Sequence, residues 1–286
     1  MIKIVADTTS GIPLHQAAKL GVAYIPQIIV FGNKSYRDDT ELDTTHFLKM
    51  LGESPILPKT AAPSPSLYTP IFSEYGKQGN TIFVICPSQK LSGTFRSATV
   101  AAQDFPNADI RIIDTLTIAG GLATLVLKAV EWADSEMSPD QLENKIIALA
   151  AQNKTYFMVD TLEFLQKGGR IGGAAALLGG ILKIKPILAT VDGEVQSVES
   201  QRTHRRAITR LKELVVTQYS PGENMYLSVM HGDAQDEAEA LAADLSEAMN
   251  IQDIPIYELP PAILVHAGPG VLAVSYFSKS TNKISA

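Results

Sequence analysis

The first half of this 286-residue chain alternates short apolar runs, rich in β-branched residues, with stretches of helical spacing. Four runs, at residues 2–8, 22–31, 81–86 and 110–114, have the length and composition of strands. Strands joined through helices run parallel, and the connecting helices then cover both faces of the sheet. The pattern therefore predicts a three-layer α/β domain built on a parallel sheet.

The second half of the chain follows a different rhythm. Asp192-Gly193 lies between two apolar runs and predicts the tight turn of a β-hairpin. A hairpin combined with helices predicts a mixed sheet that is covered mainly on one face. We therefore expect two domains, an N-terminal α/β domain at residues 1–153 and a C-terminal mixed-sheet α/β domain at residues 154–286.

Composition excludes several classes of protein. The formal net charge of −6 argues against a nucleic-acid-binding protein, which normally carries a basic face. The single Cys86 excludes an internal disulfide. No two histidines have the spacing of metal ligands, and no His-Glu-x-x-His motif is present, so we expect no metal site.

Two further features concern location. Met1 leads directly into the first predicted strand, so we expect no secretion signal. The longest apolar stretch, residues 171–191, is interrupted by Lys183, Lys185 and Pro186, which argues against stable membrane insertion. We therefore expect a cytoplasmic protein.

A glycine-rich run lies at the centre of the second half. Four glycines fall within residues 168–173, and their bare backbone can bend sharply and lie close to a neighbour or a ligand. No Gly-Lys-Ser or Gly-Lys-Thr follows, so the run is not a phosphate-binding loop. With the apolar segment that comes next, it can frame an opening into an apolar interior.

Four polar loops follow predicted strands or precede predicted helices, at residues 7–10, 59–64, 92–94 and 266–270. Ligands of parallel sheets bind beyond the carboxyl ends of the strands, so we expect the first and third loops to meet at one rim. Hydroxyls and the amides of a helix start would suit a carboxylate. The same residues are also ordinary helix caps and turn formers, and this alternative stays open.

Two other interpretations remain open. A Gly-x-Ser-x-Gly elbow is absent around Ser92, yet a Ser92–His266 dyad for acyl hydrolysis is conceivable. The basic cluster of residues 202–210 is either a solvated helix face or a docking patch for an acidic partner.

Taken in order, these segments resemble the DegV family of bacterial fatty-acid-binding proteins nearly end to end. One departure is Ala61-Ala62, where the family typically has Ser-Gln. The segments that carry the resemblance are Asp7-Thr8-Thr9-Ser10, Lys59-Thr60, Pro63-Ser64, Leu91-Ser92-Gly93-Thr94-Phe95-Arg96-Ser97-Ala98, Asp114-Thr115, Leu165-Gln166-Lys167-Gly168-Gly169-Arg170-Ile171, Lys185-Pro186-Ile187-Leu188, Arg202-Thr203, His231-Gly232 and His266-Ala267-Gly268-Pro269-Gly270.

The resemblance implies a long-chain fatty acid, such as hexadecanoate, in a buried apolar tunnel between two α/β domains. Thr60 and Ser92 match the family's carboxylate-binding hydroxyls, and Arg170 and His266 match positions near that head group. It also implies a carrier without catalytic residues or cofactor, whose bound acid is phosphorylated by a separate fatty acid kinase. The candidate ligand-binding residues are Thr60, Ser92, Gly93, Thr94, Arg170 and His266.

Two alternatives to the carrier are kept. The first is an acyl hydrolase or acyltransferase with Ser92 as nucleophile and His266 as base. The second is a non-enzymatic regulatory module that senses lipid and differs from the carrier only in its partner.

Overall fold

The computed structural model describes residues 1–135, 137–178, 184–219 and 226–278, so the apolar stretch of residues 171–191 lies partly outside the described residues. By contact the chain divides into two units, Met1–Ala151 (unit 1) and Gln152–Ala286 (unit 2). The division into domains between residues 153 and 154 stays a prediction, since these units are groups of residues in contact rather than tested folding domains.

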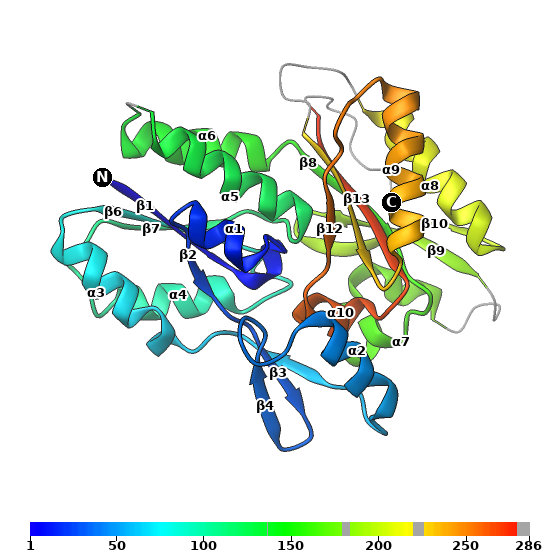
Figure 1. The fold of residues 1–286 in the computed structure, drawn as a ribbon, viewed down its shortest axis with the longest axis horizontal. Coiled ribbons are helices and arrows are strands. Elements are labelled where there is room, and N and C mark those ends of the chain that lie inside the picture. The colour runs from blue at the N-terminus through cyan, green and yellow to red at the C-terminus, as the bar shows by residue number, and fades with distance from the viewer. Residues whose placement is uncertain (136, 179–183, 220–225, 279–286) are drawn as a thin grey trace. The chain divides into compact units, whose positions relative to one another are not determined.

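Unit 1 is built on a four-stranded parallel sheet with the strand order β2-β1-β6-β7 (Figure 1). Every connection between neighbouring strands passes through a helix or a longer crossover, as parallel pairing requires. The strands are β1 (Ile2–Asp7), β2 (Ala23–Ile25), β6 (Thr81–Cys86) and β7 (Ile110–Asp114).

Helices cover both faces of this sheet. The helices α3 and α4 pack on one face around buried Tyr68 and Phe72, and α5 packs on the other face with α6 beside it. The prediction of a three-layer α/β arrangement is therefore confirmed. The helices of unit 1 are α1 (Leu14–Lys19), α2 (Thr44–Glu53), α3 (Thr69–Lys77), α4 (Thr94–Ala102), α5 (Gly120–Ala133) and α6 (Pro139–Ala150), with 3₁₀ turns at Thr8–Ser10 and Pro65–Leu67.

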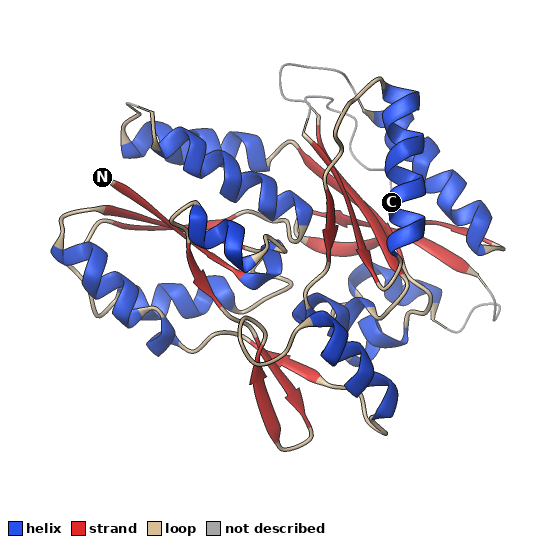
Figure 2. Ribbon diagram, viewed as in Figure 1, coloured by secondary structure: helices blue, strands red, loops and turns tan. Residues whose placement is uncertain are grey.

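The run of residues 22–31 forms two strands, and its prediction as one strand is wrong. Pro26 lacks a backbone N–H and interrupts the run, so β2 joins the parallel sheet while β3 (Ile28–Phe31) belongs to a separate antiparallel sheet. In that sheet β3 pairs with β4 (Lys34–Arg37) and β5 (Lys59–Ala61). The three short strands of this second sheet are seen in Figure 2.

Unit 2 contains a six-stranded sheet in the order β10-β9-β8-β13-β11-β12. The prediction of a mixed sheet is confirmed. Among its described strands only β11 and β12 pair in parallel. The strands are β8 (Asn153–Met158), β9 (Lys185–Val191), β10 (Glu194–Gln201), β11 (Leu227–Gly232), β12 (Ile256–Glu258) and β13 (Val271–Phe277).

Two features organise unit 2. Asp192 and Gly193 both have positive φ, 48° and 80°, and join β9 to β10 as the predicted hairpin turn. Two long helices then bury one face of the sheet around an aromatic and aliphatic core that includes stacked Tyr156 and Tyr276. The helices of unit 2 are α7 (Glu163–Lys167), α8 (His204–Gln218), α9 (Gln235–Met249) and α10 (Pro261–Ala267), with a 3₁₀ turn at Gly172–Leu177.

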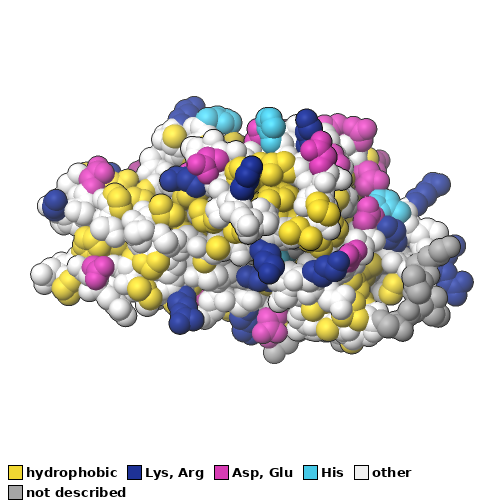
Figure 3. Space-filling model, turned by 90° about the horizontal axis from the view of Figure 1, so that it is seen from below, with side chains coloured by type: hydrophobic (Ala, Val, Ile, Leu, Met, Phe, Trp, Pro, Cys, Tyr) yellow, Lys and Arg dark blue, Asp and Glu magenta, His cyan; other side chains and the backbone are white. Residues whose placement is uncertain are grey.

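The surface of the chain carries both signs of charge. Acidic and basic side chains are interspersed among apolar ones on the face drawn in Figure 3. Within the part of the chain that the structure describes, no helix combines the length and the apolar character needed to cross a bilayer.

Candidate functional site

The first polar loop closes strand β1. Asp7 ends this strand and caps the following 3₁₀ turn by accepting a hydrogen bond from the Thr9 backbone N–H at 3.0 Å. Because β1 and β6 are parallel neighbours, the loop after β6 begins at the same rim. The Thr94 hydroxyl donates to Asp7 Oδ2 at 2.6 Å, which confirms that the two loops meet there.

The loop after β6 places Ser92 at the start of α4. Gly93 is the N-cap residue of this helix, and Ser92 Oγ accepts from the Thr94 backbone N–H at 3.3 Å. Ser92 Oγ also lies 3.0 Å from Thr94 Oγ1. Ser92 is half-buried, whereas Thr94 is 1% exposed. The Ser92 hydroxyl is thus the outer member of this pair, and the Thr94 hydroxyl is turned inward.

Strand β5 brings Thr60 to the same part of unit 1. Thr60 pairs opposite Ile29 in the small antiparallel sheet and is half-buried, so its prediction within a loop is wrong. A Cβ at Gly93 would lie 2.9 Å from Ala62 Cβ, which means that the end of β5 packs against the start of α4. Ala62, one of the two departures from the family pattern, therefore makes an apolar contact with the glycine that caps α4.

A buried carboxylate, that of Asp7, and a half-buried one, that of Asp38, lie behind these loops. Gln27 links them, because its backbone N–H donates to Asp38 Oδ1 at 2.8 Å and its side-chain amide donates to Asp7 Oδ2 at 2.6 Å. Burial raises the pKa of both carboxyls, that of Asp38 to about 7, although a hydrogen bond from Thr8 opposes the rise at Asp38. Sequence reasoning did not assign Gln27 or Asp38 to this network, since their contacts are long-range and no local motif marks them.

In unit 2 the predicted residues lie where α7 and α10 pack together. A Cβ at Gly168 would lie 2.2 Å from His266 Nδ1, and a Cβ at Gly268 would lie 2.5 Å from the Phe164 ring. The glycine at the end of each helix thus leaves room for an aromatic or imidazole ring of the other helix. His266 lies in the last turn of α10, so its prediction within a loop is wrong. Pro261 at the first helical position was a sign of this helix.

The electrostatics of this pair favour an anion. Arg170 donates to the carbonyl oxygen of Gly168 at 2.8 Å and is half-buried. Burial, together with the nearby charge of Arg170, lowers the pKa of His266 to about 4, so the imidazole is neutral at pH 7. Burial also lowers the pKa of Arg170 from its high reference value. A neutral imidazole and a partly desolvated guanidinium are both suited to a carboxylate.

The structure groups the six predicted ligand-binding residues in two sets. Ser92, Gly93 and Thr94 are in direct contact in unit 1, with the strand that carries Thr60 packed against them. Arg170 and His266 are together in unit 2. Their joint function as one site stays a prediction.

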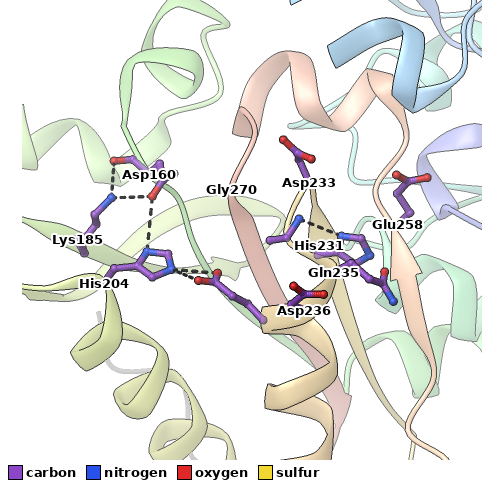
Figure 4. Close-up of a pocket in the computed structure, with 11 residues that line it drawn as sticks. Asp160, Lys185, His204, His231, Asp233, Gln235, Asp236, Glu258 and Gly270 are labelled. Carbon is purple, nitrogen blue, oxygen red and sulfur yellow. Dashed lines mark hydrogen bonds and ion pairs between the residues drawn. The ribbon is translucent and has the colours of Figure 1, made fainter. Parts of the chain in front are cut away.

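Unit 2 also has an open cleft of about 730 Å³ (Figure 4). Lys185 donates to Asp160 at 2.6 Å, and the His204 ring lies between Asp160 and Glu237, at 3.6 Å and 2.9 Å. None of the six predicted residues lines this cleft. Its walls carry several charged groups, so it is unsuited to an alkyl chain. Among the described residues, no group of three or more potential ligands is placed to hold a metal ion.

The basic cluster at the start of α8 is partly neutralised. Arg210 forms ion pairs with Glu199 at 2.8 Å and with Glu213 at 2.9 Å. The exposed basic residues of the cluster are Arg202, Arg205 and Arg206.

Comparison with known proteins gives a consistent result over the length of the chain. The matching family model, described as an uncharacterised protein of the DegV family, covers residues 1–279. A DegV domain-containing protein of Deinococcus radiodurans is 33% identical over 277 residues, which cover 96% of this chain and 97% of the relative.

Solved structures agree with this match. A DegV family protein from Thermus thermophilus, described by its fatty acid binding, superposes with a TM-score of 0.91 at 29% identity, covering 97% of this chain and 99% of that one. DegV from Bacillus subtilis, described as a fatty acid binding protein, has a TM-score of 0.86 at 30% identity, with coverage of 97% and 99%. Matched along almost its whole length by family model, relative and fold, this chain belongs to the DegV family.

Proposed function

We propose that this chain binds a long-chain fatty acid such as hexadecanoate in a buried apolar tunnel and presents its carboxylate to a separate fatty acid kinase. In this proposal the chain is a cytoplasmic carrier that performs no chemistry on the acid itself. Its ligand-binding residues are Thr60, Ser92, Gly93 and Thr94 of unit 1 and Arg170 and His266 of unit 2.

One observation carries the proposal of a fatty-acid ligand. The Thermus thermophilus and Bacillus subtilis proteins are both described as binding fatty acid, and each aligns with 97% of this chain. The similarity is not confined to one domain, so it includes every segment that would form the ligand site.

The local chemistry supports a carboxylate head group. An ionised carboxylate removed from water needs several donors, or its pKa rises until it becomes neutral. Ser92 and the start of α4 offer a hydroxyl and backbone amides, and Arg170 offers a guanidinium. His266, whose pKa is lowered to about 4, would regain affinity for a proton beside a bound anion.

The alkyl tail would provide most of the affinity. Burial of each methylene contributes about 0.8 kcal/mol, so a chain of about fifteen methylenes gives roughly 12 kcal/mol before the costs of ordering and association. The hydroxyls and the guanidinium would then fix the orientation of the acid rather than its overall affinity.

The first experiment identifies the ligand. Mass spectrometry of an organic extract of the purified chain should show a long-chain fatty acid at a ratio near one per chain. Recovery of polar small molecules alone would contradict the proposal. Delipidated protein should rebind hexadecanoate, and Ser92→Ala or Thr60→Ala should weaken this binding about tenfold. Ser135→Ala, which removes an exposed hydroxyl bonded to the Trp132 carbonyl, is the control and should leave binding unchanged.

The second experiment tests the kinase partner. With ATP and a purified fatty acid kinase, the chain loaded with hexadecanoate should give an acyl phosphate that hydroxylamine traps. Charge reversal at exposed Arg205 and Arg206 should lower the rate if these residues dock an acidic surface of the kinase. Lys19→Glu, an exposed charge reversal at the end of α1, is the control. A full rate in the Arg205→Glu/Arg206→Glu variant would remove this patch from the interface.

The hydrolase alternative has less support. Ser92 Oγ contacts the hydroxyl and the backbone N–H of Thr94, and neither of these two described contacts involves a histidine. A histidine whose pKa is lowered to about 4 is a weak general base at neutral pH. Labelling of Ser92 by a fluorophosphonate probe would favour the hydrolase over the carrier.

A further inference from the structure

The open cleft of unit 2 lies where α/β units hold their ligands. Among the described strands of unit 2, β11 and β12 are the parallel pair, and α9 connects them. In such a unit ligands bind beyond the carboxyl ends of the strands, next to the start of the connecting helix. The cleft has a volume of about 730 Å³, and its walls include residues from the ends of β11 and β12 and from the first turn of α9.

His231 places a buried hydrogen-bond donor in this cleft. It lines the cleft although the residue is only 4% exposed. Its Nδ1 accepts from the Ala234 backbone N–H at 3.4 Å, so the neutral ring carries its proton on Nε2. Among the described residues, no hydrogen-bond partner of Nε2 is present. A donor that is largely removed from water and has no partner in the protein is suited to an acceptor atom of a ligand.

The start of α9 adds further donors beside His231. This helix has 15 residues, and its N-cap residue, Ala234, makes no side-chain hydrogen bond to the first amides. Those amides and the positive end of the helix dipole favour an anionic group. Ala234 is also the residue whose N–H contacts the His231 ring, so the imidazole and the start of the helix lie side by side. Together they form one set of donors for a carboxylate.

The cleft also holds carboxylates that are available to a cation. Asp233, Asp236 and Glu258 line it and are exposed. In the described part of the chain, none of these three carboxylates takes part in a hydrogen bond or an ion pair. Glu258 lies directly opposite His231 in the pairing of β11 with β12, so the two side chains share one face of the sheet.

The cations of the cleft are engaged elsewhere. Lys185 donates to Asp160 at 2.6 Å, and the His204 ring lies between Asp160 and Glu237. Figure 4 shows this linked group on one side of the cleft and the His231 ring on the other. A positive group of a ligand would therefore find carboxylates that no cation of the cleft neutralises.

We propose that this cleft binds a basic amino acid such as lysine. The α-carboxylate of the ligand accepts from His231 Nε2 and from the amides at the start of α9, and its ammonium groups pair with Asp233 and Glu258. A phosphate fits less well, because the nearby carboxylates repel a dianion. A bare metal ion is also disfavoured, since within the described ranges no three potential ligands are placed to hold one. A molecule with a carboxylate and ammonium groups uses both sets.

Three small molecules test the two halves of the proposal on full-length protein. Lysine has both kinds of group, cadaverine is lysine without the carboxylate, and diacetyllysine keeps the carboxylate but has no ammonium group. Isothermal titration should show lysine binding about tenfold more tightly than either of the other two, because each lacks one set of contacts. Equal affinity for lysine and cadaverine would reduce the cleft to a non-specific acidic surface and would overturn the inference. Equal affinity for lysine and diacetyllysine would also overturn it.

Two variants separate the contributions of the donor and of the carboxylate. His231→Phe keeps a ring but removes the Nε2 donor, so it should abolish the preference for lysine over cadaverine. His231→Gln, whose amide can replace that donor, should restore part of the preference, which a role in packing alone would not predict. Glu258→Gln should weaken lysine and cadaverine alike, by about tenfold. If His231→Phe does not fold, Glu258→Gln and the three molecules still decide the question.

The same helix offers a matched control. Glu247 is an exposed carboxylate near the other end of α9, so Glu247→Gln should leave the affinity for lysine unchanged. An equal loss in Glu247→Gln and Glu258→Gln, or no binding of lysine by the wild type at about 10 mM, would overturn the inference. The result does not depend on the proposed fatty-acid site, since none of the residues proposed for that site lines this cleft. The affinity for hexadecanoate should therefore be the same in all of these variants.

Discussion

Units 1 and 2 offer a carboxylate two different kinds of environment. In unit 1 the candidate donors are neutral hydroxyls and amides, held by a dense network of hydrogen bonds around buried Asp7. In unit 2 the candidate groups are a guanidinium and an imidazole, held by the close packing of two short helices. In unit 1 the positions of the donors depend on the direction of hydrogen bonds, whereas in unit 2 they depend on how closely side chains pack. The stability of the two units should therefore respond differently to pH and to added side-chain volume.

The pH dependence of unit 1 is the largest expected effect; it follows from Asp7, whose pKa burial raises, and from Asp38. The pKa of Asp38 is raised to about 7 in the folded state, so its contribution to stability is full below pH 4 and is lost as the pH rises through 7. The free energy of unfolding of unit 1 should therefore fall by up to about 4 kcal/mol over this range. Hydrogen exchange resolved by segment would measure it, and Asp38→Asn should flatten the slope. A flat wild-type profile would contradict the prediction.

Added volume should damage unit 2. Gly268→Ala places a Cβ 2.5 Å from the Phe164 ring at a φ of 76°, so we expect a loss of about 3 to 4 kcal/mol in the free energy of unfolding. Gly169→Ala is the matched control, because Gly169 has a φ of 70° but no atom within 4 Å of the added Cβ. It should cost only about 1 to 2 kcal/mol. Equal losses in thermal or urea unfolding would show that backbone conformation, rather than packing, limits this region.

The pH dependence of unit 2 should have the opposite sign. The folded-state pKa of His266 is lowered to about 4 from 6.5, so its stabilising contribution is full above pH 6.5 and is lost as the pH falls through 4. The expected loss for unit 2 is about 3 kcal/mol. His266→Gln should abolish this slope, whereas exposed His15→Gln in unit 1 should not. If the stability of both units changed in the same direction with pH, the proposed contrast between them would be wrong.

The smallest expected effect is on ligand affinity and concerns Arg170 of unit 2. Arg170→Gln should weaken hexadecanoate binding about tenfold by removing one charge-assisted hydrogen bond. Arg111→Gln is the control, since Arg111 forms ion pairs with Asp109, Asp140 and Glu143 at 3.1, 2.6 and 2.8 Å. Equilibrium binding of delipidated protein would measure both variants. Unchanged affinity in Arg170→Gln would leave the head group to the donors of unit 1.

Elements with clear borders could be predicted from the sequence. The bounds of β6 and β7 agree with the predicted ranges 81–86 and 110–114, because the apolar runs end there at turn residues. The mixed sheet followed from a hairpin turn whose φ angles only a few residue types adopt readily.

The remaining elements depend on contacts between distant parts of the chain. The three-residue strand β5 is too short to show an alternation of apolar and polar residues in the sequence. It forms because β3 pairs with it. Similarly, the sequence marks Asp7 as a cap but does not show that Thr94, 87 positions away, donates to it. The types of candidate donors were predictable, and the groups that hold them were not.

The position of the Thr60 hydroxyl depends on the number of residues in β5, because the pairing register of this strand decides which side chains face each side of the small sheet. Thr60 faces one side of the small sheet while Lys59 and Ala61 face the other, so deletion of a single residue within β5 would exchange the hydroxyl for one of its neighbours. The exposed tip at Gly32 and Asn33, between β3 and β4, has no such constraint. Natural insertions and engineered reporter peptides should therefore be tolerated at that tip. Insertions or deletions within β5 should not be tolerated.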